Sequence, residues 1–198
     1  MVITKKLKKI LFMKNLVLTL IIAVMSISAF GQNKLSTTSG HIKFFSSTPA
    51  EDIEANNYKA ISIIKPAIGT IVFSIPMQSF EFEKSLMQKH YNSERFLDTK
   101  KFPKSKFKGT ITNIADIDFN GNGSYQAAVK GTLTIHGISK EVSEKFIITV
   151  KDGNITGITE FNIVLADYGI MFKDGKPSTN IAKTIKIKAN FNYSEISS

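Results

Sequence analysis

The feature that most constrains the fold is an alternation of apolar and polar residues with a period of two. Between Tyr125 and Ile135, apolar side chains alternate with residues such as Gln126, Lys130 and Thr132. The same period recurs in residues 71–77, 146–150 and 185–193. It places alternate side chains on opposite faces of a β-strand, so that one face can be buried. The pattern therefore predicts an all-β domain with buried strand faces.

Further strands are expected at residues 41–47, 60–64, 107–114 and 156–165, which brings the total to about eight. Tight turns are expected at residues 120–123, 152–154 and 174–177. Each of these segments contains Gly with Asn or Asp, the residues that tolerate a positive φ. About eight short strands joined in this way predict a sandwich or an up-and-down barrel.

Residues 80–92 break the alternation and predict a single helix. Apolar residues recur there at helical spacing, at Phe82, Leu86, Met87 and Tyr91. Ser79 is the expected N-cap, and Glu81 lies where the helix dipole favours a negative charge. Such a lone helix either closes one mouth of the barrel as a lid or only covers the core.

Residues 1–31 are expected to be a cleaved signal peptide. Five lysines precede an uncharged run of 15 residues, 16–30, which is shorter than the roughly 20 residues of a membrane-spanning helix. Ala29-Phe30-Gly31 fits a signal peptidase site before Gln32, and Met13 is an alternative start. The mature domain, residues 32–198, would then be periplasmic or secreted and would contain no integral membrane segment. The other interpretation of the leader is a retained membrane anchor.

The charge and the reactive residues exclude several classes of protein. The net charge is +10, of which about +5 remains without the leader, and Arg95 is the only arginine. A nucleic-acid partner is not expected, because base recognition relies on bidentate arginine contacts. The chain has no cysteine, so it forms no disulfide. Its three histidines lack metal-ligand spacing, so that no metal and no cofactor is expected.

An enzyme is not expected either. Ser139, His136 and Asp167 are the residue types of a hydrolase relay, but Ser139 lies in no Gly-x-Ser-x-Gly turn. His136 precedes Gly137 at a break in the strand pattern. The pair is expected to form a turn, with Gly137 supplying the unusual backbone angle and His136 hydrogen-bonding a turn carbonyl.

Three segments resemble the YceI-like family, also called polyisoprenoid-binding proteins. Residues 131–140, Gly-Thr-Leu-Thr-Ile-His-Gly-Ile-Ser-Lys, are similar to the central motif of the family. Residues 90–103 resemble its "His-Leu … Phe-Phe-Asp … Tyr-Pro" segment, and residues 167–170 resemble its Asp-Phe-Gly-Ile. The resemblance covers most of residues 41–192. It implies an antiparallel, lipocalin-like β-barrel around an apolar lumen, and an exported protein that binds a long isoprenoid lipid.

The apolar stripes either line such a lumen or pack as a core, since a barrel of about eight strands allows both. The candidate ligand-binding residues on the strands are Tyr125, Val129, Leu133, Ile135, Phe146, Ile148, Ile185, Ile187 and Phe191, and the helix adds Phe82, Leu86 and Met87. A lumen predicts a carrier of an isoprenoid or other long-chain lipid. A side-chain-filled barrel predicts a structural or interaction protein of the cell envelope.

Two surface features leave alternatives open. Lys84, Lys89, His90 and Arg95 cluster around the helix, where they either meet a polar lipid headgroup or form a solvated face. The phenylalanine-rich loop at residues 96–102 is a candidate contact for a homodimer.

Overall fold

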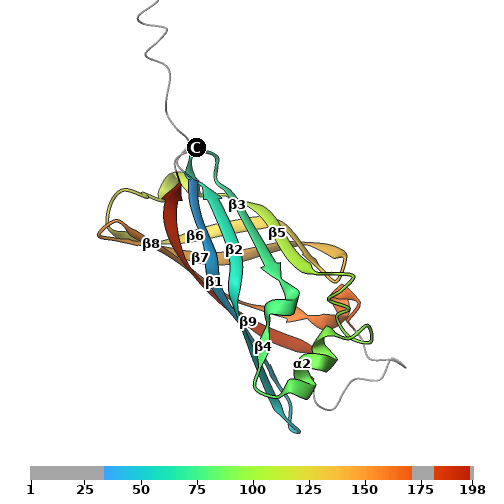
Figure 1. Ribbon diagram of the computed structural model, residues 1–198. Coiled ribbons are helices and arrows are strands. Elements are labelled where there is room, and N and C mark those ends of the chain that lie inside the picture. The colour runs from blue at the N-terminus through green and yellow to red at the C-terminus, as the bar shows by residue number, and fades with distance from the viewer. Residues whose placement is uncertain (1–33, 171–180, 197–198) are drawn as a thin grey trace, which may run out of the picture. The chain divides into compact units, whose positions relative to one another are not determined.

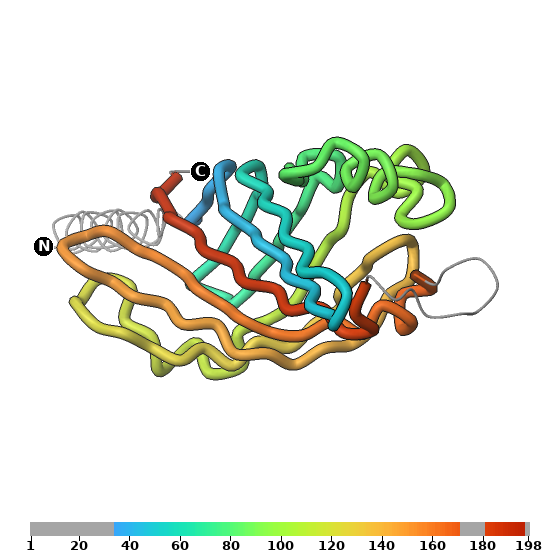
Figure 2. The backbone as a smooth tube through the Cα atoms, turned by 90° about the horizontal axis from the view of Figure 1, so that it is seen from below, coloured from blue at the N-terminus to red at the C-terminus, as the bar shows by residue number. Residues whose placement is uncertain are grey.

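The chain folds into a closed antiparallel β-barrel with one short α-helix (Figure 1). The computed structural model describes residues 34–170 and 181–196. Eight strands form the wall of the barrel, and Figure 2 shows the backbone from below, with the strands running obliquely across the view. This architecture confirms the fold class expected from the alternation and from the family resemblance.

Sequence neighbours are also neighbours around the barrel, which gives it an up-and-down topology. The order is β1-β9-β8-β7-β6-β5-β3-β2, and pairing of β1 with β2 closes the ring. The strands are β1 (Lys34–Ser47), β2 (Asp52–Lys65), β3 (Thr70–Pro76), β4 (Glu81–Phe82), β5 (Lys104–Ile111), β6 (Gly123–Ile135), β7 (Ile138–Lys151), β8 (Asn154–Val164) and β9 (Thr184–Ile196). The helices are α2 (Ser85–Asn92) and the 3-10 turns η1 (Pro66–Ile68), η2 (Met77–Ser79), η3 (Ile114–Asp116) and η4 (Leu165–Tyr168).

Two of the hairpins turn on a pair of residues with positive φ. His136 (φ 50°) and Gly137 (φ 77°) join β6 to β7, and Asp152 (φ 50°) and Gly153 (φ 79°) join β7 to β8. Turns of this kind match the twist of the strands that they connect. Both turns confirm expectations from the sequence.

The tight turn predicted at residues 120–123 is wrong. Residues 112–122 instead join β5 to β6 as a longer loop that contains η3, and no residue of 120–123 has a positive φ. The Asn113 side chain supports this loop, because it accepts a hydrogen bond from Ala128 N at 2.8 Å and donates one to Gln126 O at 3.0 Å. The turn expected at residues 174–177 lies outside the described residues.

The helix is shorter than the sequence predicts and begins at Ser85 rather than at Phe80. Residues 81–82 form β4 instead, which pairs with β2. The Gln88 side chain holds the preceding segment extended, since it accepts from Phe82 N at 3.3 Å and donates to Phe80 O at 2.6 Å. Ser79 belongs to η2 and does not cap α2. Strand pairing and this side chain therefore override the helical spacing.

Four phenylalanine rings fill one part of the barrel interior, and we call them the aromatic plug. The ring centre of Phe73 lies 4.9 Å from Phe191, 5.7 Å from Phe146 and 5.9 Å from Phe107. The Phe191 ring packs against Gly40 in the wall, where a Cβ atom would lie only 2.3 Å from the ring. Glycine at this position therefore makes room for the plug.

The wall between β7 and β8 is hydrogen-bonded over only part of its length. Residues 147–151 pair with residues 154–158, whereas residues 138–146 pair with β6 alone among the described strands. The Thr159 hydroxyl donates to Lys145 O at 2.7 Å where the two strands separate. We call this gap the β7–β8 seam.

Candidate functional site

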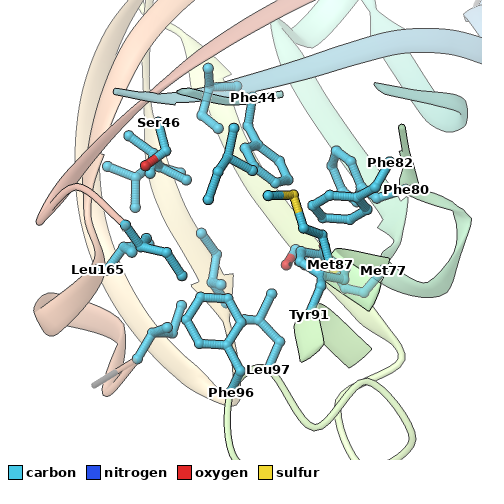
Figure 3. Close-up of a pocket in the computed structure, with 18 of the residues that line it drawn as sticks. Phe44, Ser46, Met77, Phe80, Phe82, Met87, Tyr91, Phe96, Leu97 and Leu165 are labelled. Atoms are coloured by element: carbon cyan, nitrogen blue, oxygen red, sulfur yellow. Dashed lines mark hydrogen bonds between the residues drawn. The ribbon is translucent and has the colours of Figure 1, made fainter. Parts of the chain in front are cut away.

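Beside the aromatic plug, the barrel interior contains an apolar cavity of about 610 Å³ (Figure 3). Barrel strands form its wall, and α2 with the loop that follows covers one side. The aliphatic residues that line it are Ile42, Ile53, Ile75, Leu97, Leu133, Ile135, Ile163, Leu165, Ile170, Ile181, Ile185 and Ile187. The volume lies within the range of roughly 300–1,000 Å³ that is typical of small-molecule sites.

Four rings on the α2 side of the cavity form a second cluster, which we call the aromatic corner. The ring centre of Tyr91 lies 5.0 Å from Phe82, 5.7 Å from Phe80 and 5.9 Å from Phe44. The Tyr91 side chain comes from the last turn of α2, Phe44 from β1 and Phe82 from β4. Contacts from three sides hold the Tyr91 ring in one orientation.

Three buried hydroxyl groups line the cavity. Ser46 accepts a hydrogen bond from Ala182 N at 2.8 Å, and Ser105 donates one to Met77 Sδ at 3.0 Å. In the described part of the chain, the Tyr91 hydroxyl is the one buried side-chain polar atom without a partner. Figure 3 shows its oxygen directed into the cavity. Burial raises the pKa of Tyr91 well above its usual value, so this hydroxyl stays protonated at neutral pH.

Polar and charged side chains lie at the mouth of the cavity. His90 and Arg95 are exposed and contribute to the lining. Lys84 pairs with Glu51 at 2.8 Å, and the hydrogen bond to Glu51 raises the pKa of Lys84. Lys84 and Lys89 do not line the cavity. The basic cluster expected from the sequence is thus divided between the cavity mouth and the outer face of the helix.

The structure separates the predicted ligand-binding residues into three groups. The cavity is lined by Phe82, Met87, Leu133, Ile135, Ile185 and Ile187. A smaller space of about 90 Å³ beside the aromatic plug is lined by Val129, Phe146 and Phe191, and it shares Leu133 and Ile187 with the large cavity. Tyr125, Ile148 and Leu86 line neither space: Ile148 is fully buried, Tyr125 is half-buried, and Leu86 on α2 is 61% exposed.

Several lining residues were not singled out as ligand contacts. Ile42, Phe44 and Ser46 alternate along β1, and Phe161, Ile163 and Leu165 continue that pattern from β8 into η4. The alternation in both expected strands would have placed them on the inner face. Strand alternation did not place Phe80 or Tyr91. Helical spacing put Tyr91 on the apolar face of the predicted helix, but the two rings meet only after the chain folds over the mouth.

The three family-like segments meet at the rim of the barrel. His136 Nδ1 donates to the carbonyl oxygen of Tyr168 at 3.2 Å, and its ring packs edge-on against Phe102 at 4.6 Å. The carbonyl is indeed a turn carbonyl, but it belongs to η4 on the far side of the β7–β8 seam. His136 therefore fastens the β6–β7 turn to η4 and to the loop before β5, and we call this contact the clasp.

The serine and histidine side chains of the hydrolase and metal hypotheses have other partners. The Ser139 and Thr134 hydroxyl oxygens lie 2.8 Å apart, whereas the His136 ring contacts Tyr168 and Phe102. His41 Nε2 lies 2.8 Å from Asn56 Oδ1. Within residues 34–170 and 181–196, no group of three or more His, Cys, Asp or Glu residues could hold a metal ion.

The described ranges contain no helix with the length and hydropathy that crossing a bilayer requires.

A family model described as the YceI-like domain matches residues 22–193. A UPF0312 protein of Shewanella denitrificans is 32% identical over 126 residues, and one of Pseudomonas fluorescens is 31% identical over 125 residues. Each match spans 59% of this chain and 61% of the relative, which is less than two thirds of the relative's length.

Two solved structures share the barrel fold at low sequence identity. BcnA of Burkholderia cenocepacia aligns with a TM-score of 0.64 at 19% identity, over 78% of this chain and 96% of BcnA. A polyisoprenoid-binding domain from Saccharophagus degradans aligns with a TM-score of 0.69 at 14% identity, over 83% of this chain and 99% of that domain.

Proposed function

Because the chain belongs to the YceI-like domain family, we propose that it binds a long-chain lipid, specifically an isoprenoid, in the barrel cavity. The observation that carries the proposal is the apolar cavity of about 610 Å³ beside the aromatic plug. The solved polyisoprenoid-binding domain, which shares the barrel fold, supports the isoprenoid as ligand.

Burial of the lipid chain in the apolar lining is the main favourable contribution to the proposed binding. Each buried methylene contributes about 0.8 kcal/mol, so ten of them contribute roughly 8 kcal/mol. Association costs roughly 4–15 kcal/mol, because the lipid loses translational and rotational freedom. An isoprenoid has fewer freely rotating bonds per carbon than a saturated chain, so that ordering it costs less conformational entropy. We therefore expect an isoprenoid to bind in this cavity with higher affinity than a saturated chain of equal size.

The size of the cavity limits the length of chain that it encloses. If each carbon occupies roughly 30 Å³, close to the share of one water molecule in the liquid, the cavity encloses on the order of 20 carbons. That is about four isoprene units. A longer chain extends through the mouth, where His90 and Arg95 would meet a polar headgroup.

The proposed mechanism is passive, with no bond made or broken in the lipid. The barrel removes the chain from water, and the exposed mouth leaves the headgroup solvated. The proposal also assigns residues 1–31 to a cleaved signal peptide and the barrel to the periplasm or the exterior. Intact-mass measurement of the protein from its native envelope should then give Gln32 as the first residue, and a retained leader would contradict the cleavage.

The rival function is a structural or interaction protein of the envelope. The aromatic plug favours it, because those rings fill their part of the barrel with side chains. The cavity beside the plug opposes it, since a barrel that serves only as a scaffold has no need of a lined space of this size.

Extraction of the purified protein with organic solvent, followed by mass spectrometry, distinguishes the two functions. The lipid carrier yields a lipid in about one-to-one ratio. A folded protein that carries no lipid and takes up no added isoprenoid would support the scaffold.

Two neighbouring residues of α2 provide a matched pair of variants. Met87 lines the cavity, whereas Leu86 is 61% exposed and does not. Met87→Asp should lower the retained lipid at least about tenfold, because it places a carboxylate against the apolar chain. Leu86→Asp should retain the wild-type amount. Equal retention by the two variants would show that the lipid does not lie in this cavity.

A further inference from the structure

We propose that the Tyr91 hydroxyl donates a hydrogen bond to an uncharged carbonyl oxygen of the bound lipid. The inference rests on the proposed function and deepens it, because it names the chemical group that the cavity recognises. It also predicts that the ligand is not a pure hydrocarbon.

The Tyr91 hydroxyl is the atom that requires such a partner. Its side chain is 5% exposed, and its oxygen points into the cavity without a hydrogen-bond partner among the residues that the structure describes (Figure 3). A buried polar group without a partner is costly, and most such groups in folded proteins are satisfied. The Ser46 and Ser105 hydroxyls on the same lining already have partners. Of these three buried hydroxyls, that of Tyr91 alone has no partner among the described residues.

The aromatic corner holds this donor in place. Phe82, Phe80 and Phe44 surround the Tyr91 ring at centre-to-centre distances of 5.0, 5.7 and 5.9 Å. A ring packed in this way loses little further freedom when its hydroxyl binds an acceptor. The donor is thus preorganised for a ligand that enters the cavity.

The surroundings select an uncharged acceptor. The lining near Tyr91 consists of aromatic and sulfur-containing side chains, among them Met77 and Met87. A bare anion there would lose its hydration without gaining a cation, because His90 and Arg95 lie at the exposed mouth. Phosphate is therefore expected at the mouth, and a neutral carbonyl at Tyr91.

The main test compares an isoprenoid ketone with the matching hydrocarbon in the wild-type protein and in two variants. The probes are farnesylacetone, an isoprenoid ketone, and the hydrocarbon in which a methylene replaces its carbonyl. Affinities are measured by displacement of a fluorescent lipid. Tyr91→Phe keeps the ring packing and removes the hydroxyl, so it should bind the ketone about tenfold more weakly and the hydrocarbon unchanged. Tyr58→Phe removes a hydroxyl from a side chain that is 53% exposed and outside the cavity, and it should change neither affinity.

Infrared spectroscopy of ¹³C=O-labelled farnesylacetone gives a second measurement that needs no variant. A hydrogen bond from Tyr91 lowers the carbonyl stretching frequency of the ketone bound to the wild-type protein. An unshifted frequency, or an equal loss of affinity for both probes in Tyr91→Phe, would overturn the inference.

The outcomes separate this inference from the proposed function. If the wild-type protein binds neither probe, the lipid-binding function itself fails. If it binds both and Tyr91→Phe binds both equally well, lipid binding stands and the role of Tyr91 falls. Farnesyl phosphate is the third probe: a tenfold loss for it in Tyr91→Phe would overturn the assignment of an uncharged acceptor.

Discussion

The packing of Phe191 against Gly40 predicts a large coupling between substitutions at these two positions. A Cβ atom added at Gly40 would lie 2.3 Å and 2.4 Å from two carbons of the Phe191 ring, where ordinary contacts are 3.4–4 Å. Gly40→Ala should therefore destabilise the protein by about 1–3 kcal/mol through overpacking. Phe191→Ala removes a ring that is 1% exposed and should cost about 3–5 kcal/mol.

In the double variant, the methyl group at position 40 occupies space that the ring has left. The clash then disappears, and the remaining close contact is with Ala60 O at 3.0 Å. The two single costs should therefore exceed the cost of the double variant by about 1–3 kcal/mol.

Urea unfolding of the wild type, both single variants and the double variant measures this coupling. The comparison requires an unchanged m-value, because a change in m would mean that a variant alters the compactness of the folded or unfolded state. Additive costs within about 0.5 kcal/mol would refute the reasoning. The destabilisation caused by Gly40→Ala would then not come from a clash with the Phe191 ring, and the aromatic plug would not require glycine at this position of the wall.

Burial raises the pKa of Tyr193, whose hydroxyl also contacts Ser62. Above about pH 10 the folded state therefore binds more protons than the unfolded state, and the free energy of unfolding falls by up to about 1.4 kcal/mol per pH unit. Tyr193→Phe should flatten this slope in unfolding measured from about pH 9 to 11. Gly137→Ala should destabilise the protein more than Gly153→Ala. Both glycines have a positive φ that strains alanine, but only a Cβ at Gly137 would meet Phe102, at 2.6 Å. Equal melting temperatures of the two variants would contradict the clasp. Isoprenoid affinity should rise with chain length up to on the order of 20 carbons and then level off in displacement titrations, and a continued rise to twice that length would contradict the cavity size.

The sequence predicted the wall of the barrel better than its contents. Alternation shows which side chains point inward, and it placed Leu133 and Phe146 on the same inner face. It does not show how far along the barrel axis each one lies, which depends on strand register. The rings of the plug come from four strands and meet only once that register is set. One barrel therefore contains both a packed core and a cavity, the two alternatives that the sequence left open.

The helix and its surroundings show a different limit. Glu81 and Phe82 have helical spacing with the residues that follow, but pairing with β2 and the hydrogen bonds of Gln88 hold them extended. The pairing partner in β2 is distant in sequence, and the hydrogen bonds of the Gln88 side chain depend on the final fold. Local periodicity therefore misplaced the start of α2. Periodicity placed Tyr91 on the apolar face of the predicted helix, but it could not show that the ring would pack against Phe44 and Phe80.

The β7–β8 seam has a consequence for self-association. Among the described strands, residues 138–146 of β7 have a hydrogen-bonded neighbour on one side only, and such an edge can recruit a strand from another molecule and start aggregation. Four charged residues interrupt this edge: Lys140, Glu141, Glu144 and Lys145. Each would have to be desolvated or brought against a like charge if a second copy were added in register. Replacing them with apolar residues would turn a gap in a barrel wall into a template for fibrils.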